Sequence, residues 1–153
     1  MVSKKQVNKF VKSQESIQFY KKIQGALTEV LQAMPNEDFH KVTKNLKIIS
    51  LQEGIIGQAM VFPNSKGKFK VVSIVYVPKI PMNVLKFIIA HELGHIHQGR
   101  HNTKKGENIY ILEKHANKMA KKWGFPPTEK TWEWIFKYMK KYKIKWPKDW
   151  PKE

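Results

Sequence analysis

Two histidines and a glutamate lie within five residues of the chain, in the order His91-Glu92-Leu93-Gly94-His95. The flanking sequence predicts a helix over about 82–98, because prolines precede it, Gly99 follows it, and apolar residues recur at helical spacing. Residues four apart on a helix lie only about 40° apart around its axis. The pattern therefore predicts a helix whose two imidazoles point to one side and can bind one metal ion.

A catalytic zinc site needs a third protein ligand and one open position. Glu92 is offset around the helix from the histidines, so we expect it to act as a general base on a zinc-bound water. Glu113 is the preferred third ligand, and Asn117, four residues later on the same predicted helix, can brace a histidine ligand from the second shell. Ala116 and Ala120 are small enough to let the two helices approach closely.

Two other histidines compete with Glu113 for the third position. His101 follows His91 by ten residues, the spacing of three-histidine sites, although the glycine that turns the chain in such sites comes one residue later here, at Gly99. His115 lies about 200° around the helix from Glu113, so the two side chains cannot both face the metal. A donor that stabilises the transition state is also expected. The candidates for it are Tyr110, His115, His97 and Tyr76.

The rest of the chain predicts an α+β domain with a small three-stranded sheet. The run 71–77 is apolar on both faces, which is typical of an inner strand. All 153 residues are interpreted as a single domain, with segments 1–12 and 144–153 as flexible or clamping tails. The expected elements are an N-terminal helix at 13–34, strands at 46–51, 57–62 and 69–77 with a turn at 64–67, and helices at 82–98, 108–123 and 128–142.

Charge is the most unusual feature of the composition. Lysine and arginine number 29 against 12 acidic residues, for a net charge of +17. A charge this large attracts polyanions and acidic proteins at long range. Nearly all of it is lysine, whose compact charge favours attraction over the reading of specific bases. The lysine-rich surface therefore leaves two interpretations, a nucleic acid or an acidic protein as a partner, or a lysine-rich composition that only keeps the protein soluble.

Composition also excludes several classes of function. The chain has no cysteine, which removes disulfides, Cys-ligated zinc, iron–sulfur clusters and thiol catalysis. No apolar run is long enough for a membrane span, and the N-terminal sequence lacks the apolar core of a secretory signal. We therefore expect a cytoplasmic protein with no membrane partner, and its oligomeric state stays open.

Segments 87–95 and 113–120, with the strand that precedes them, resemble the gluzincin zinc peptidases, and are most similar to the small ImmA/IrrE-type domains. Those domains pair an AHELGH helix with a downstream E-x-E-A-(N/D)-x-x-A helix. The resemblance covers roughly residues 68–124 and implies a zincin-like fold, with Zn²⁺ held by His91, His95 and Glu113 and with Glu92 as the catalytic base. It also implies that the strand at 57–62 is the rim that binds an extended peptide.

The chain departs from that family at two positions, because His115 replaces the second acidic residue and Met119 replaces the usual aromatic. No helix-turn-helix segment accompanies the motif, so a link to repressor cleavage does not carry over. SprT-like proteases share the HExxH motif and a basic character, but they normally use a third histidine, and Glu113 argues against that assignment.

The leading hypothesis is a zinc metalloendopeptidase that hydrolyses peptide bonds in a protein substrate. One alternative is a basic, zinc-stabilised module that binds nucleic acid or an acidic protein without catalysis. Another is a three-histidine zinc hydrolase acting on RNA, which depends on His101 as the third ligand.

Overall fold

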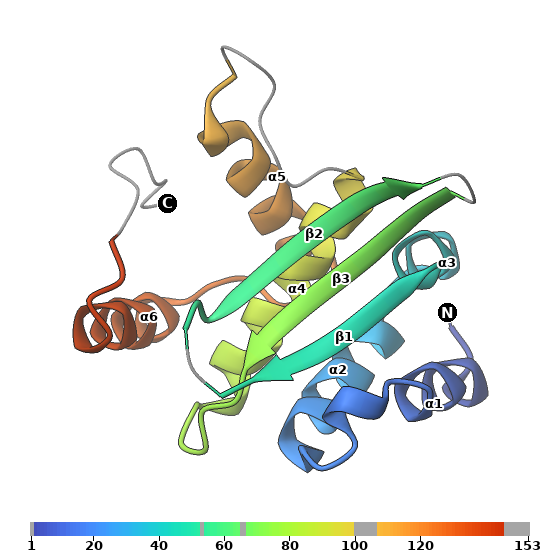
Figure 1. The fold of residues 1–153 in the computed structure, drawn as a ribbon, viewed down its shortest axis with the longest axis horizontal. Coiled ribbons are helices and arrows are strands. Elements are labelled where there is room, and N and C mark those ends of the chain that lie inside the picture. The colour runs from blue at the N-terminus through green and yellow to red at the C-terminus, as the bar shows by residue number, and fades with distance from the viewer. Residues whose placement is uncertain (1, 53, 65–66, 100–106, 146–153) are drawn as a thin grey trace.

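The structure is a computed structural model that describes residues 2–52, 54–64, 67–99 and 107–145. These residues form an α+β fold, as predicted, in which helices pack on one small mixed sheet (Figure 1). The elements are α1 Lys4–Lys12, the 3₁₀ turn η1 Glu15–Ile17, α2 Lys21–Ala33, α3 Asn36–Thr43, β1 Leu46–Leu51, β2 Gly57–Asn64, β3 Gly67–Val75, α4 Met82–Gln98, α5 Ile109–Lys122 and α6 Glu129–Lys141.

The three strands are ordered β1-β3-β2, with β1 parallel and β2 antiparallel to β3. The inner position of β3 confirms the prediction from its two apolar faces, and Val72, Ile74 and Val75 are buried. Helices α2 and α4 cover one face of the sheet (Figure 1). Because β2 is last in the strand order, it is an edge strand, and it packs against α4.

Helix α4 has the bounds that the sequence predicts, and Gly99 ends it in the left-handed conformation at φ 80°. Buried residues occupy every side of this helix from Val84 to Ile96. A helix that is apolar around its circumference belongs in an interior. The contacts of α4 with α2, the sheet and α5 provide that interior, so the HExxH motif is held on the most enclosed helix of the fold.

The N-terminal part of the chain differs from the prediction. The expected helix at 13–34 begins only at Lys21, because side chains before Lys21 hydrogen-bond the backbone at the outer edge of β1. Gln14 Oε1 accepts a hydrogen bond from the backbone N–H of Ile48 at 2.9 Å, and Ser16 Oγ accepts one from Ser50 at 3.0 Å. These two bonds satisfy backbone N–H groups at the edge of β1, so the segment that contains Gln14 and Ser16 is held against the sheet.

Two helices were not predicted. Residues 4–12, expected as a flexible or clamping tail, form α1, which begins with a Ser3–Gln6 capping box and packs on α2 with Val7 and Val11 buried. Helix α3 begins directly after Pro35, which ends α2 as predicted.

At the other end of the chain, Ile144 and Lys145 follow α6, and 146–153 lie outside the described residues. None of the helices in the described ranges is long and apolar enough to cross a membrane.

Candidate metal centre

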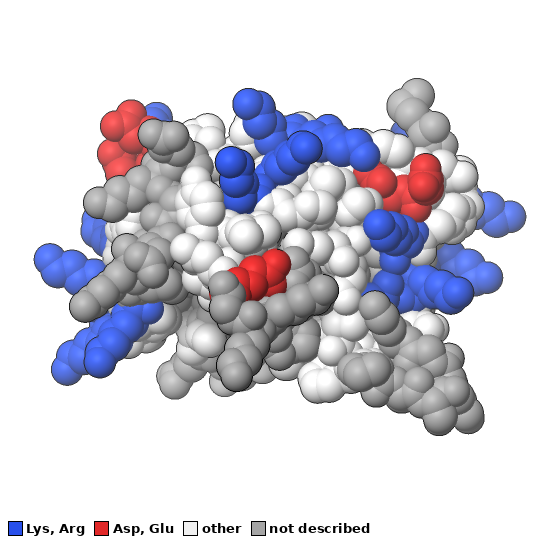
Figure 2. All heavy atoms as spheres, turned by 90° about the horizontal axis from the view of Figure 1, so that it is seen from above, with Lys and Arg blue, Asp and Glu red and all other residues white. Residues whose placement is uncertain are grey.

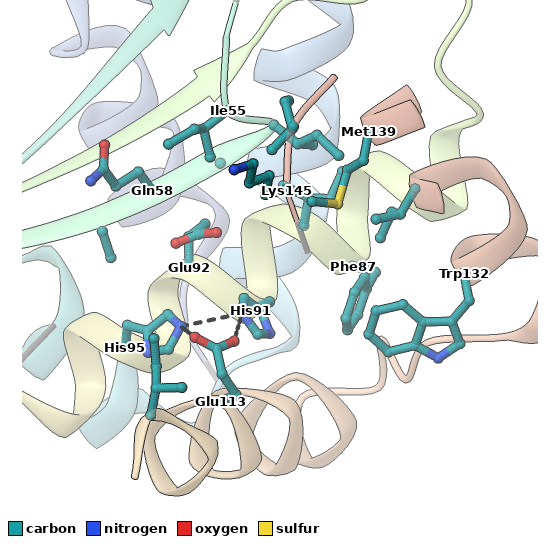
Figure 3. A pocket seen from close by; sticks show the side chains of 17 residues that line it. Ile55, Gln58, Phe87, His91, Glu92, His95, Glu113, Trp132, Met139 and Lys145 are labelled. Carbon is teal, nitrogen blue, oxygen red and sulfur yellow. Dashed lines mark hydrogen bonds and ion pairs between the residues drawn. The ribbon is translucent and has the colours of Figure 1, made fainter. Parts of the chain in front are cut away.

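Three buried side chains from two helices meet at one point. His91 and His95 lie one turn apart on α4, and Glu113 faces them from α5 (Figure 3). His91 Nε2 is 3.0 Å from Glu113 Oε2, His95 Nε2 is 3.5 Å from Glu113 Oε1, and the two Nε2 atoms are 3.2 Å apart. Within the described residues, these three form the group of histidine and acidic side chains that can hold a metal ion.

The spacing of these atoms fits a small tetrahedral ion. Ligands at about 2.0–2.1 Å from a tetrahedral zinc lie about 3.3 Å from one another. The two Nε2 atoms are 3.2 Å apart, and the two oxygens of Glu113 lie 3.0 Å from one of them and 3.5 Å from the other, so one small cation could contact both imidazoles and the carboxylate. When neither Nε2 carries a proton, the lone pairs of the imidazoles and the carboxylate face one another, and a cation between them would relieve their repulsion. The residues present therefore fit a metal ion of this kind.

Asn117 contacts the first histidine of the motif. Its Oδ1 lies 2.8 Å from His91 Nδ1. A carbonyl oxygen can only accept, so Nδ1–H of His91 donates, and in the neutral imidazole the Nε2 lone pair is directed at the metal position. Asn117 lies one turn after Glu113 on α5, so a single helix supplies both a ligand and the brace of a second ligand.

Small residues allow the two helices to approach closely enough to share a site. A Cβ added at Gly94 would lie 2.8 Å from the Cα of Ala116 and 2.9 Å from its carbonyl oxygen, which no side chain can tolerate without movement. Ala116 and Ala120 are fully buried, in agreement with the expected close contact. Glycine is therefore required at this position of the HExxH motif by the packing of α4 against α5.

The pKa shifts of Glu113 and His91 favour positive charge between them. Burial alone would raise the pKa of Glu113, but hydrogen bonds from His91 and His95 outweigh it and lower that pKa to about 2. Burial alone would lower the pKa of His91, but the carboxylates of Glu113 and Glu92 outweigh it and raise that pKa. Protons and a metal ion would therefore compete for the same ligand atoms.

Glu92 lies on the opposite side of α4 from α5, against the edge strand β2. Its carboxylate bonds the backbone of Ala59, and a Cβ added at Gly57 would approach Glu92 Oε1 to 2.8 Å. Burial, the largest influence, raises the pKa of Glu92 above its usual value. A carboxylate with a raised pKa is a better proton acceptor near neutral pH. Gly57 is a residue that the sequence pattern did not single out, because its role depends on the packing of β2 against α4.

A cavity of about 380 Å³ opens beside Glu92 and the three candidate ligands (Figure 3). One wall is β2 with the segment before it, and the opposite wall is α6 with the residues that follow it. Most of the lining is apolar. The residues that line the cavity are Ile55, Ile56, Gly57, Gln58, Ala59, Phe87, Ile88, His91, Glu92, His95, Ile109, Glu113, Trp132, Ile135, Met139, Ile144 and Lys145.

The other predicted site residues lie elsewhere. His115 stacks on His97 at 5.8 Å between ring centroids, on the far side of the α4–α5 contact. Tyr110 lies in the first turn of α5 with its ring under Lys114, and Tyr76 packs on Tyr20. None of the four predicted transition-state donors is among the cavity-lining residues named above. The polar side chains there, besides Glu92 and the ligands, are Gln58, Trp132 and Lys145. His101 lies outside the described residues.

His97 and His115 form a second group of histidines, and Asp38 of α3 contacts it. Its Oδ1 lies 3.3 Å from His97 Nε2, and its Oδ2 accepts hydrogen bonds from Lys122 Nζ and Trp123 Nε1, both at 2.8 Å. Burial would raise the pKa of Asp38, but these two hydrogen bonds outweigh it, and the net direction is downward. Burial lowers the pKa of both His97 and His115. This group joins α3, α4 and α5 and has no opening to the cavity.

Comparison of the chain with protein-family models, with curated protein sequences and with solved structures found no match.

Proposed function

We propose that the protein is a zinc-dependent metallopeptidase of the gluzincin type, as the resemblance to ImmA/IrrE-type domains suggested. The observation that carries the proposal is the convergence of His91, His95 and Glu113 beside a separate, buried carboxylate, Glu92, at the wall of an open cavity. Two imidazoles and one carboxylate are a ligand set of catalytic zinc sites, which leave a further position for water or substrate. The three-histidine alternative relies instead on His101.

Zinc bound there would supply a lowered pKa for a coordinated water and would polarise the carbonyl to be cleaved. Glu92 is the residue that we expect to accept the proton of the attacking water and to deliver it to the leaving amine. The backbone of Ala59 and the close approach of Gly57 hold the Glu92 carboxylate in place for both transfers. An extended peptide would lie along β2, whose residues 57–59 line the cavity.

The substitution Glu92→Gln tests the proposal. Glutamine keeps the shape of the side chain but cannot accept a proton, so we expect zinc binding to persist and peptide hydrolysis to fall by about 10²- to 10⁴-fold. Zinc is measured by mass spectrometry, and hydrolysis on a mixed library of quenched fluorescent peptides. The matched control is Glu37→Gln, the same change at an exposed residue of α3, which should leave both quantities unchanged. Undiminished hydrolysis by Glu92→Gln would reject the assigned role.

A further inference from the structure

The far end of the cavity is apolar and is built by α6. Ile135 is buried, Met139 is half-buried, and Trp132 packs edge-to-face on Phe87 with 5.5 Å between centroids. The volume of about 380 Å³ is at the lower end of the range of small-ligand sites, about 300–1,000 Å³. The cavity therefore has room for one large side chain of a bound peptide, and its lining favours an apolar one.

A tight turn after α6 brings a positive charge to this apolar wall. Lys143 adopts the left-handed conformation at φ 53°, and the N–H of Ile144 bonds the carbonyl of Met139 at 2.9 Å. This is the Schellman arrangement, which reverses the chain at the end of a helix. Ile144 and Lys145 consequently line the cavity, and Figure 3 shows Lys145 between Ile55 and Met139 in this view.

The charges around the cavity leave Lys145 available to a ligand. Glu113 is engaged by the two histidines, and Glu92 by the backbone of Ala59. No ion pair between described residues includes Lys145, whose side chain is exposed. An ammonium group beside an apolar cavity favours a ligand that presents a carboxylate next to an apolar side chain.

The overall charge points the same way. The chain carries +17, and Figure 2 shows lysine side chains projecting from many places on one face, with few acidic ones among them. Such a field raises the encounter rate with acidic partners and falls off with added salt. The local charge at Lys145 and the surrounding field thus select for the same kind of partner.

We propose that Lys145 determines specificity, and that the substrates are acidic protein segments in which a carboxylate adjoins a large apolar residue. This inference rests on the proposed peptidase function, because only a peptidase would hydrolyse the bound segment. The binding preference itself requires no hydrolysis. An apolar cavity with a single lysine among its described lining fits a peptide better than a nucleic acid, because the phosphate backbone of a nucleic acid is bound by several cations.

Peptide binding to the Glu92→Gln protein tests the preference without turnover. The probes are fluorescein-labelled, alanine-rich octapeptides with Phe-Glu, Phe-Gln, Phe-Lys or Ala-Glu at the centre, and anisotropy is read with zinc and with a chelator. We expect Phe-Glu to bind about fivefold more tightly than Phe-Gln, the size of a partly exposed ion pair, and Ala-Glu to bind more weakly than Phe-Glu. In Lys145→Glu the order of Phe-Glu and Phe-Lys should reverse.

The matched control is Lys140→Glu, which makes the same change in net charge on α6 but does not alter the cavity lining. It should weaken all acidic peptides slightly and keep the preference for Phe-Glu. Equal binding of Phe-Glu and Phe-Gln, or a preference that survives Lys145→Glu, would overturn the inference. So would a DNA duplex that displaces the peptide from the wild-type cavity but no longer does so from Lys145→Glu.

A further pair of probes identifies the source of the carboxylate. Octapeptides that end in Phe, with a free or an amidated C-terminus, test recognition of a terminal carboxylate. Tight binding of the free acid adds chain ends to the substrate class, and weak binding of both restricts it to acidic side chains. Either result supports the role of Lys145 once the Phe-Glu preference is established.

The active protein gives an independent readout. Lys145→Ala should raise KM for a Phe-Glu substrate about fivefold and leave kcat unchanged, because the lysine binds substrate and transition state equally. Should Glu92→Gln show that the proposed chemistry is wrong, the peptide preference can still hold. Should hydrolysis be confirmed with no such preference, the inference about Lys145 fails alone.

Discussion

Helices α4 and α5 carry two groups of histidines on opposite faces, and each group has one buried carboxylate. At the metal centre, Glu113 contacts two imidazoles, and the rings of His91 and His95 are nearly perpendicular at 88°. In the second group, Asp38 contacts one imidazole together with a lysine and an indole, and the rings of His97 and His115 are stacked at 18°.

The source of positive charge separates the two groups. Lys122 and Trp123 already bond Asp38, whereas the partners of Glu113 among the described residues are two imidazoles, which supply positive charge when protonated. The pKa of His91 is accordingly raised, and the pKa values of His97 and His115 are lowered. Residue type alone therefore does not identify a metal site. What differs is whether other donors already bond the buried carboxylate, as Lys122 and Trp123 bond Asp38, or whether it is left to attract a cation.

The largest expected effect comes from removing the carboxylate of the second group. Asp38→Ala leaves the buried indole N–H of Trp123 without its acceptor, so we expect the free energy of unfolding to fall by about 2–3 kcal/mol. Urea unfolding of the chelated protein measures this change. Zinc stoichiometry at saturating metal should remain one per chain, because none of the proposed ligands is altered.

Glu37→Ala removes the adjacent exposed acid of α3 and should change the free energy of unfolding by less than about 0.5 kcal/mol. Loss of zinc in Asp38→Ala, without loss of stability, would reverse the assignment of the two groups.

The next effect comes from separating α4 and α5, on which both groups depend. Gly94→Ala places a Cβ against the backbone of Ala116, so we expect a loss of about 1–3 kcal/mol in the free energy of unfolding and weaker zinc binding. Thermal unfolding and a zinc competition assay measure the two quantities.

Gly25→Ala is the control for the same change in a helix with open space around it. It should stabilise the protein by about 0.5–1 kcal/mol, because alanine is the better helix former. Equal stability of the two variants would mean that the close contact between α4 and α5 at Gly94 is not needed for stability.

The smallest effect is a difference in pH dependence between the groups. His97 and His115 have folded pKa values below 6.5, so below that pH the unfolded chain binds protons more readily and stability falls. His91 has a raised pKa, so its contribution is fully present below pH 6.5 and is lost as pH rises through the folded value. Asp38 and Glu113 have lowered pKa values, so their contributions to stability are lost only as pH falls below their ordinary pKa values of 3.8 and 4.5.

In the chelated protein, His97→Gln/His115→Gln should lose less stability than wild type between pH 7 and pH 5.5. The difference is expected to be a few tenths of a kcal/mol for each histidine, since both are partly exposed and the charges facing them are screened by solvent. The groups that act on them are Asp38, Lys41, Lys118, Lys122 and His95, and His97 also acts on His115. Urea unfolding at the two pH values measures the change, and a steeper loss in the double variant would contradict the assignment.

The parts of the fold that follow from local pattern were predictable from the sequence. The bounds of α4 and the inner place of β3 depend on the pattern along one element, and both agree with the structure. The break between Ser13 and Lys21 was not predictable, because the side chain of Gln14 bonds an edge strand 34 residues away.

The same distinction holds at the site. The convergence of His91, His95 and Glu113 could be expected from helical geometry. The roles of Gly57 and Lys145 depend on β2 packing against α4 and on the turn at Lys143, which no single segment reveals. His115 shows the limit of pattern, since its spacing from Glu113 excluded it as a co-ligand but did not identify His97 as its partner.

The metal content of matched variants tests the central claim most directly. Wild type, Glu113→Ala, His115→Ala and His101→Ala are dialysed against a weak chelator, and zinc is measured by mass spectrometry. We expect one zinc per chain in wild type, in His115→Ala and in His101→Ala, and loss of zinc in Glu113→Ala. Wild type that holds no zinc even after it is added back, or loss in His115→Ala or His101→Ala with retention in Glu113→Ala, would contradict the claim.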